Sequence, residues 1–254
     1  GAVAAVCRSG IAADHATRMV RAGALPRAFG HTHRKHGPQR APKNKGHSML
    51  KNIIYDWNGF NTSLFYTINS FHTPLYDHFM MLGTMLAKSY DFAAYLPIIL
   101  CIAYVQLSRK KRSLALDYDV YAQRWKRTIV TLIISFVFTV TWVAALKNYL
   151  SFPRPFVALP EGSVVKLWDE TPYSSFPSGH CSFAIMMVVS LWPMLGNKGK
   201  AAAIFYLLWV GMSRMVLGVH FPADVIGSFV INLAVLYCLR KVISRVWKPI
   251  KARG

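Results

Sequence analysis

The chain has 254 residues, 54% of them hydrophobic, and carries a formal net charge of +20 at neutral pH. A chain of this length forms one domain or one compact membrane bundle, and so high a hydrophobic fraction favours the bundle over a soluble domain. Four scattered cysteines do not indicate a disulfide framework of the kind that stabilises small secreted proteins.

Residues 1–48 differ in composition from the rest of the chain. They are rich in Ala, Arg, His and Gly, contain a single acidic residue, Asp14, and show no sustained periodicity. This composition fits either an organellar transit peptide or a non-native, tag-like extension, and the stretch HTHRKHGPQRAPKNKGHSM favours the extension. We therefore expect a disordered extension over residues 1–48 and a membrane domain over residues 49–254.

Residues 57–85 are less apolar than the segments that follow. The stretch WNGFNTSLFYTINSF contains three asparagines and several hydroxyls, and a helix-breaking Thr-Pro pair follows at residues 73–74. Two interpretations stay open: a weaker sixth membrane span, or a pair of helices that lie in the membrane interface.

Five later segments are apolar and nearly free of charge. They are residues 92–107, 129–146, 181–195, 201–219 and 225–239. A helix needs roughly 17 to 25 apolar residues to cross a bilayer; each segment is near this length, although the third is marginal. None has the polar stripe of a soluble helix. The sequence thus predicts an all-α, integral membrane helical bundle with five strong spans and a weaker sixth or interfacial segment at its amino end.

The basic residues gather in four clusters between or beside these segments. The clusters are residues 109–112, 124–127, 198–200 and 240–253. Five spans threaded between them place all four clusters on one side of the membrane, and the positive-inside rule predicts that this side is cytoplasmic. The positive charge is therefore interpreted as a topology signal, and no nucleic-acid partner is expected.

Polar residues of unusual kinds gather at the opposite side. Each has a structural explanation when taken alone: Lys147 can snorkel at a helix end, and Ser178 can cap a helix. Arg214 is harder to explain in this way, because a charge in an apolar span costs about 2.5 to 3.5 kcal/mol at mid-bilayer and usually marks a functional site. Their convergence on one side predicts a site that consists of Lys147, Arg154, Ser178, Gly179, His180, Arg214, His220 and Asp224.

The types of residue in this set suit a phosphate group. The three cations offer fixed charge and forked donors for a tetrahedral oxyanion. Pro177 is expected in the first turn of a helix, where Ser178 offers a hydroxyl and Gly179 lets an anion approach the free N–H groups. His180, at the rim of this cradle, is placed to exchange a proton with a leaving oxygen.

His220 and Asp224 are spaced i, i+4 around Pro222. Asp224 can bond one ring nitrogen of His220, fix its tautomer and leave the other nitrogen free to attack. His220 is therefore the predicted nucleophile and His180 the predicted general acid. The loop carboxylates, which are few, do not form an evident metal set, so we expect phosphoryl transfer without a metal or another cofactor.

Three blocks in this half of the chain resemble a known family signature. They are K-x-x-x-x-x-x-R-P at residues 147–155, P-S-G-H at residues 177–180 and S-R-x-x-x-x-x-H-x-x-x-D at residues 213–224. The chain is identified by them as a member of the type 2 phosphatidic acid phosphatase superfamily, in its membrane lipid phosphatase branch with the undecaprenyl pyrophosphate and phosphatidylglycerophosphate phosphatases. The resemblance implies a membrane phosphatase domain over residues 49–254, with its catalytic signature at 147–224.

The resemblance also assigns roles to the site residues. It implies a phosphohistidine at His220, orientation by Asp224, protonation of the leaving group by His180, and phosphate binding by Lys147, Arg154, Ser178, Gly179 and Arg214. The predicted substrate is a lipid phosphate or pyrophosphate: undecaprenyl pyrophosphate, phosphatidylglycerophosphate or phosphatidate. The expected place is a bacterial inner membrane, with the site facing the periplasm or exterior. Two alternatives stay open, namely phosphotransfer to another lipid such as lipid A, and lipid binding or transport without catalysis.

Overall fold

The computed structural model describes residue 49, residues 52–113 and residues 117–246 of the chain. Every regular element in this described part is a helix, and the part contains no strand. The predicted all-α class is therefore confirmed. The extension expected over residues 1–48 lies outside the described residues, so the predicted boundary at residue 49 stays a prediction.

Three helices are long and apolar enough to cross a membrane. They are α5 (Phe92–Arg112), α6 (Tyr118–Leu150) and α10 (Pro222–Val246), whose candidate spans run over Ser89–Arg112, Tyr118–Ala158 and Pro222–Arg245. Large apolar side chains on these helices face outward, among them Ile102, Phe138 and Val230. An outer surface so apolar suits lipid rather than water. The predicted helical membrane bundle is thus confirmed in its class.

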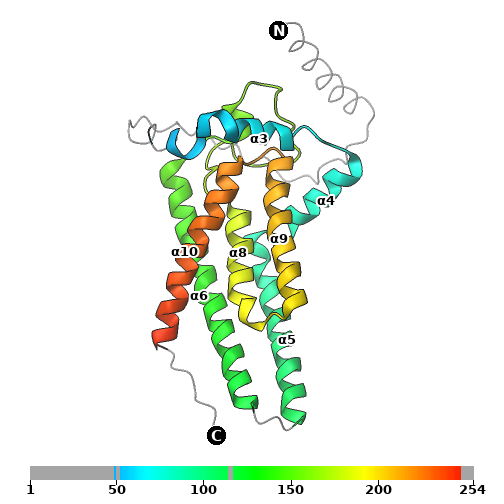
Figure 1. Ribbon diagram of the computed structural model, residues 1–254, viewed down its shortest axis with the longest axis vertical. Coiled ribbons are helices and arrows are strands. Elements are labelled where there is room, and N and C mark those ends of the chain that lie inside the picture. Colours follow the sequence, from blue (N-terminus) through cyan, green and yellow to red (C-terminus); the bar gives the residue numbers. More distant parts are fainter. Residues whose placement is uncertain (1–48, 50–51, 114–116, 247–254) are drawn as a thin grey trace.

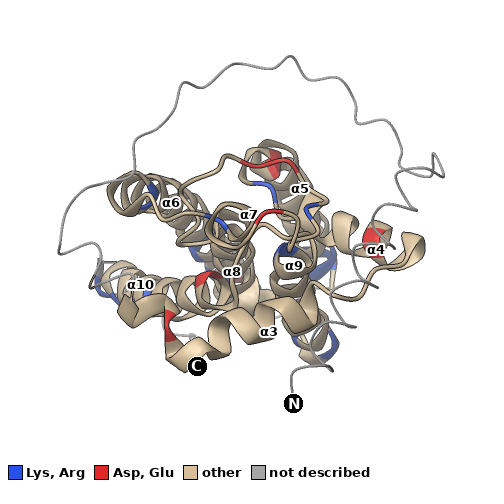
Figure 2. Cartoon of the chain, turned by 90° about the horizontal axis from the view of Figure 1, so that it is seen from above, with Lys and Arg blue, Asp and Glu red and all other residues tan. Residues whose placement is uncertain are grey.

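Two further helices complete the bundle. Helix α8 (Gly179–Leu191) is only about 20 Å long at 1.5 Å per residue, and α9 (Asn197–Val216) carries lysines in its first turn and Arg214 near its end. Neither meets the length and composition of a candidate span, so the count of five stays a prediction. Helix α8 contacts α6, α9 and α10, which surround it in the view from above (Figure 2). It is apolar all round because it is enclosed all round.

The weaker amino-terminal segment forms two separate short helices after the 3-10 turn Trp57–Gly59. They are α3 (Phe60–Ile68) and α4 (Pro74–Met85), and Thr73 caps α4 through its hydroxyl. At about 13 and 18 Å, neither alone spans the roughly 30 Å of a bilayer core. Helix α3 lies across the end of the bundle, over the tops of α9 and α10 (Figure 1).

The asparagines that weaken this segment's apolar pattern fasten α3 to the bundle. The Asn61 side chain accepts a hydrogen bond from the N–H of Ala223 (3.0 Å) at the start of α10. Asn69 donates to the carbonyls of Val165 (3.0 Å) and Val216 (2.8 Å). Both asparagines are buried, so these two positions are polar in order to hydrogen-bond backbone groups, not because they face water.

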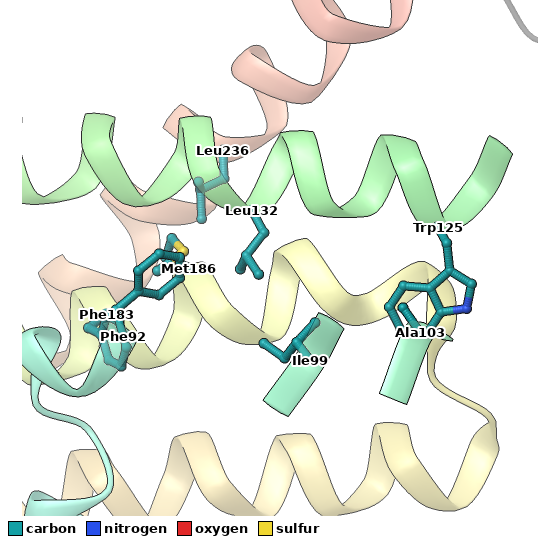
Figure 3. Close-up of a cluster of buried hydrophobic side chains, with 8 residues drawn as sticks. All are labelled: Phe92, Ile99, Ala103, Trp125, Leu132, Phe183, Met186 and Leu236. Carbon is teal, nitrogen blue, oxygen red and sulfur yellow. The ribbon is translucent and has the colours of Figure 1, made fainter. Parts of the chain in front are cut away.

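A cluster of buried apolar side chains holds the long helices together around α8 (Figure 3). The ring of Phe92 in α5 stacks on Phe136 in α6, with centroids 3.8 Å apart, and the edge of Phe183 in α8 meets both. Aromatic pairs of this geometry add to the hydrophobic gain of burial. The cluster consists of Phe92, Ile99, Ala103, Trp125, Leu132, Phe183, Met186 and Leu236.

The charged ends of the helices are segregated along the bundle. The basic cluster at residues 109–112 ends α5, residues 124–127 lie in the first turns of α6, and residues 198–200 begin α9. Arg240 and Arg245 lie near the end of α10. All these ends point away from α3, which covers the opposite end of the bundle (Figure 1). The predicted site residues therefore belong to the end covered by α3.

Candidate active site

His220 lies in the short link between α9 and α10. Gly218 makes the turn possible: its φ is +74°, and a Cβ there would come within 2.3 Å of the Val165 carbonyl oxygen. The N–H groups of Val219 and His220 both donate to the Arg214 carbonyl at 3.2 Å. Helix α10 then begins at Pro222, because a proline is favoured in the first turn.

Asp224, in the first turn of α10, is fully buried and surrounded by donors. Its Oδ2 accepts from the Ser175 hydroxyl (2.6 Å), the Phe221 N–H (2.8 Å) and His220 Nδ1 (3.2 Å), while its Oδ1 accepts from the Tyr55 hydroxyl. An ionised carboxylate can accept all four bonds. The predicted pairing of Asp224 with His220 is present, whereas its partners Tyr55 and Ser175 were not foreseen from the sequence.

The two ring nitrogens of His220 have different partners. Nε2 lies 3.0 Å from Arg154 Nη1, and because a guanidinium can only donate, Nε2 must accept. The ring proton therefore lies on Nδ1, directed at Asp224. Burial, reinforced by the nearby Arg154 charge, lowers the pKa of His220 well below its ordinary value, so the imidazole is neutral. A lone pair on Nε2 is what nucleophilic attack requires.

Tyr55 approaches this pair from the segment that precedes α3. Burial, followed by the Asp224 charge, raises the pKa of Tyr55 well above its ordinary value, so the phenol stays a neutral donor. Its ring also packs edge-on against Phe152 and Phe221. The amino-terminal segment thus contributes directly to the orientation of Asp224.

Arg154 joins the loop before α8 to the loop after α9. Only 2% exposed, it donates through Nε to the Thr171 carbonyl (2.7 Å) and through Nη1 to the Val219 carbonyl (2.9 Å). Its Nη2 donates to Glu170 Oε2 at 3.0 Å. A planar guanidinium can make these bonds at once, so the side chain is held rigidly beside His220.

Glu170 bridges the two predicted phosphate-binding arginines. Its Oε1 accepts from Arg214 Nη2 at 2.5 Å, and its Oε2 accepts from Arg154. Nothing in the sequence distinguishes Glu170 from the other loop carboxylates, but its side chain is only 19% exposed and pairs with two buried arginines. Since Arg214 is fully buried and also donates to Thr84, Glu170 separates it from the cavity described below.

The start of α8 differs in two respects from what the sequence predicted. Ser178, with extended backbone angles, is the N-cap, and Pro177 precedes it in a cis peptide bond rather than occupying the first helical turn. The N–H of Ser178 is not free for an anion, because it donates to Ser228 Oγ at 2.7 Å. The donors left at this helix start are the N–H groups of Gly179 and the two residues after it, which have no acceptor within the helix.

Lys147 in α6 faces this helix start. Its ammonium donates to the Ser174 carbonyl at 2.6 Å. A Cβ added at Gly179 would lie 3.7 Å from Lys147 Cε, in ordinary contact, so the glycine leaves room between the helix start and the lysine. This gap adjoins three backbone donors, and it suits a phosphate oxygen.

A cavity of about 200 Å³ joins these groups. Five of the eight predicted residues line it, while Ser178, Arg214 and Asp224 lie behind its wall. Among the described residues, three buried polar atoms at the site have no hydrogen-bond partner within the protein: Ser178 Oγ, His180 Nε2 and Arg214 Nε. A bound ligand could pair with such atoms. The lining consists of residues 87–90, Lys147, Arg154, Glu170, Gly179, His180 and His220.

The described residues offer no cluster of three or more His, Cys, Asp or Glu side chains that could hold a metal ion. Glu170 and Asp224, the carboxylates nearest His220, are engaged by arginine, hydroxyl and backbone donors. Metal independence stays a prediction, which the chelator experiment below tests.

Residues 127–248 match the PAP2 superfamily, and this segment contains all eight predicted site residues. This match covers slightly less than half of the chain and confirms the resemblance drawn from the three motifs. A solved structure, LpxE of Aquifex aeolicus, is similar with a TM-score of 0.56 and 26% identity, over 74% of this chain and 98% of that one.

Two curated proteins are similar over shorter stretches. The undecaprenyl-diphosphatase BcrC of Bacillus subtilis is 36% identical over 83 residues, 33% of this chain and 41% of its own length. The lipid A 1-phosphatase of Rhizobium etli is 34% identical over 83 residues, 28% of this chain and 35% of its own length. The alignments thus span well under half of either relative.

Proposed function

We propose that this protein is a membrane phosphatase that removes a terminal phosphate from a lipid phosphate or diphosphate through a phosphohistidine. The observation that carries the proposal is the state of His220: it is neutral, its Nδ1 proton is held by Asp224, and its Nε2 lone pair accepts from Arg154 in a side chain that lines a cavity with Lys147 and Arg154. A site that only bound phosphate would have no use for a nucleophile held in this way.

The proposed reaction begins when the terminal phosphate lies between Lys147, Arg154 and the start of α8. His220 Nε2 attacks phosphorus, an N–P bond forms, and the bond from phosphorus to the leaving oxygen breaks. His180 gives its proton to that oxygen, and the shortened lipid departs. Water then loses a proton to His180, attacks the phosphohistidine and releases inorganic phosphate, which restores both histidines.

The cations supply charge where charge develops. The phosphate oxygens compete with the Glu170 carboxylate for the donors of Arg154 and Arg214, because both anions suit the same guanidinium groups. The free N–H groups at the start of α8 need no such exchange, and fixed donors of this kind stabilise the phosphoryl group during transfer without reorganising. Arg214 contributes once Glu170 yields its Nη2 group to the phosphate.

We place this site at the outer side of a bacterial inner membrane. Helices α5, α6, α9 and α10 and the shorter α8 would cross the bilayer together, and the basic ends of α5, α6, α9 and α10 would lie in the cytoplasm. The relatives named undecaprenyl-diphosphatase and lipid A 1-phosphatase support a lipid substrate. Undecaprenyl pyrophosphate, phosphatidylglycerophosphate and phosphatidate are the first substrates to test.

The test is phosphate release by the detergent-purified full chain in excess chelator, with each of these lipids and with lipid A. We expect release from at least one lipid, and its loss in His220→Ala. Release that depends on an added metal would contradict metal independence. Label that passes from the substrate to a second lipid instead of water would identify a phosphotransferase, and tight binding with no release from any lipid would indicate a binding protein.

A further inference from the structure

Lys88 stands at the cavity opposite the motifs that define the site. It precedes the short 3-10 helix Ser89–Asp91, between α4 and α5, and it lines the cavity together with His180 and His220. This part of the chain lies outside the segment matched by the family and outside the three signature blocks. The proposed function gives Lys88 no role.

The ammonium of Lys88 is held by aromatic rings. Its Nζ lies 5.4 Å from the ring centroid of Tyr90 and 5.2 Å from that of Trp168, within the range of cation–π attraction. Trp168 lies two residues before Glu170, so the loop that carries Glu170 also supports Lys88. The half-buried lysine is thus fixed at the cavity rather than extended into solvent.

Lys88 also lacks a counter-charge. Among the described residues no carboxylate forms an ion pair with it, whereas Lys110 pairs with Asp117 and Lys166 pairs with Asp169. Aromatic rings orient an ammonium group but do not neutralise it. A partly buried cation at the wall of an anion site remains available for a second negative group of the ligand.

The position of that second group follows from the direction of the reaction. In the proposed reaction His220 provides the attacking nitrogen, and His180 protonates the leaving oxygen. Lys88 shares the cavity with both. The atom that follows the leaving oxygen in the substrate is a carbon in a phosphate monoester and a phosphorus in a diphosphate. Only the diphosphate offers a further anion to a cation there.

We propose that Lys88 binds the phosphate adjacent to the scissile one, and that the preferred substrate of this site is a lipid diphosphate. The inference rests on the proposed function and names its substrate class. His220 Nε2 bonds to the terminal phosphorus, and the bond from that phosphorus to the bridging oxygen breaks. The bridging oxygen takes a proton from His180 and leaves on a lipid monophosphate, whose charge Lys88 neutralises. Water then releases one inorganic phosphate.

The first test compares a polyprenyl diphosphate with the polyprenyl monophosphate of the same chain length. We expect Lys88→Met to lower the ratio of kcat/KM for the diphosphate to that for the monophosphate by about tenfold or more, equivalent to about 1.4 kcal/mol. Lys88→Arg should restore most of the ratio. Lys200→Met is the matched control. The Lys200 ammonium also lies over a tryptophan ring, that of Trp192, but Lys200 is in the first turn of α9, far from the cavity. An unchanged ratio in Lys88→Met would overturn the proposal.

A binding measurement separates this inference from the proposed activity. Methylenediphosphonate, which has two phosphonates and no bridging oxygen to cleave, should bind the unmodified protein more tightly than methylphosphonate, and Lys88→Met should abolish that preference. If the preference is present while no lipid is hydrolysed, the proposed phosphatase activity fails but the double-anion site stands. Equal affinity for the two phosphonates in the unmodified protein would overturn the double-anion site itself.

Discussion

Replacing Asp224 by asparagine tests the orientation of the nucleophile without removing a side chain. An asparagine can place its oxygen where Oδ2 accepts from Ser175, Phe221 and His220, and its amide at Oδ1, where the Tyr55 hydroxyl can turn and accept. The fold therefore tolerates the change. What is lost is a negative charge 3.2 Å from His220 Nδ1.

The size of the effect follows from that distance. His220 becomes positively charged when its Nε2 bonds to phosphorus, and unit charges 3.2 Å apart attract by about 5 kcal/mol at an effective dielectric constant of about 20. The amide dipole recovers part of this stabilisation. Because each 1.36 kcal/mol changes a rate tenfold, we expect kcat to fall by about 10²- to 10⁴-fold.

The assay is single-turnover phosphate release by detergent-purified Asp224→Asn, with circular dichroism and the melting temperature as checks of folding. Tyr55→Phe is the companion variant: it removes one donor to Asp224 but leaves the charge, so we expect a loss of about tenfold to 10²-fold, in line with one hydrogen bond to a charged group. A folded Asp224→Asn protein that turns over within tenfold of the parent would refute the electrostatic role of Asp224.

Three further predictions follow from the site geometry. Glu170→Gln removes the anion that competes for the arginines, so inorganic phosphate should inhibit about tenfold more tightly, equivalent to about 1.4 kcal/mol; weaker inhibition would mean that Glu170 serves mainly to position the arginines. Gly179→Ala should lower kcat/KM about tenfold while the melting temperature stays within about 4 °C, because the added Cβ meets only Lys147 Cε at 3.7 Å. Because the pKa of His220 is depressed in the folded protein, the unfolded state binds more protons at low pH, and stability should fall as pH drops below about 6.5. His220→Gln should make that fall shallower. If the melting temperatures of the parent and of His220→Gln changed equally between pH 7.5 and 5.0, this reasoning would be wrong.

The sequence was most informative where a residue type is unusual in its local context and therefore indicates a functional site. An arginine inside an apolar span, a Ser-Gly-His ahead of a helix and a His-Asp pair spaced by one turn all pointed to the same end of the bundle. The structure brings five of the eight predicted site residues to one cavity and sets Asp224 beside His220. Local spacing sufficed for that pair because α10 begins at Pro222.

Partners from distant segments were beyond such reasoning. Tyr55 lies 169 residues before the aspartate that it contacts, and Glu170 lies 44 residues before Arg214. A tyrosine in a polar segment and a glutamate in a loop carry no local signal of burial. The asparagines near Tyr55 gave an indirect indication that this segment packs on the bundle. An amide that hydrogen-bonds buried backbone groups also lowers the apparent hydrophobicity of its segment.

The span count shows a different limit of sequence patterns. Apolar composition identified α5, α6 and α10 because their outer faces are exposed and apolar along their length. Helix α8 is apolar for another reason: it is enclosed by its neighbours, and its length is set by the cap at Ser178 and the turn at Trp192. Hydropathy alone does not separate a lipid-facing helix from a protein-enclosed one.

The most direct test of the central claim is to trap the phosphorylated protein. The purified chain is mixed with a lipid diphosphate or monophosphate labelled in its terminal phosphate, quenched in alkali within a turnover, and mapped by mass spectrometry. We predict one label per active chain, stable to base and labile to acid, on His220, and none in His220→Ala. Turnover with no covalent label, or a label on another residue, would contradict the account.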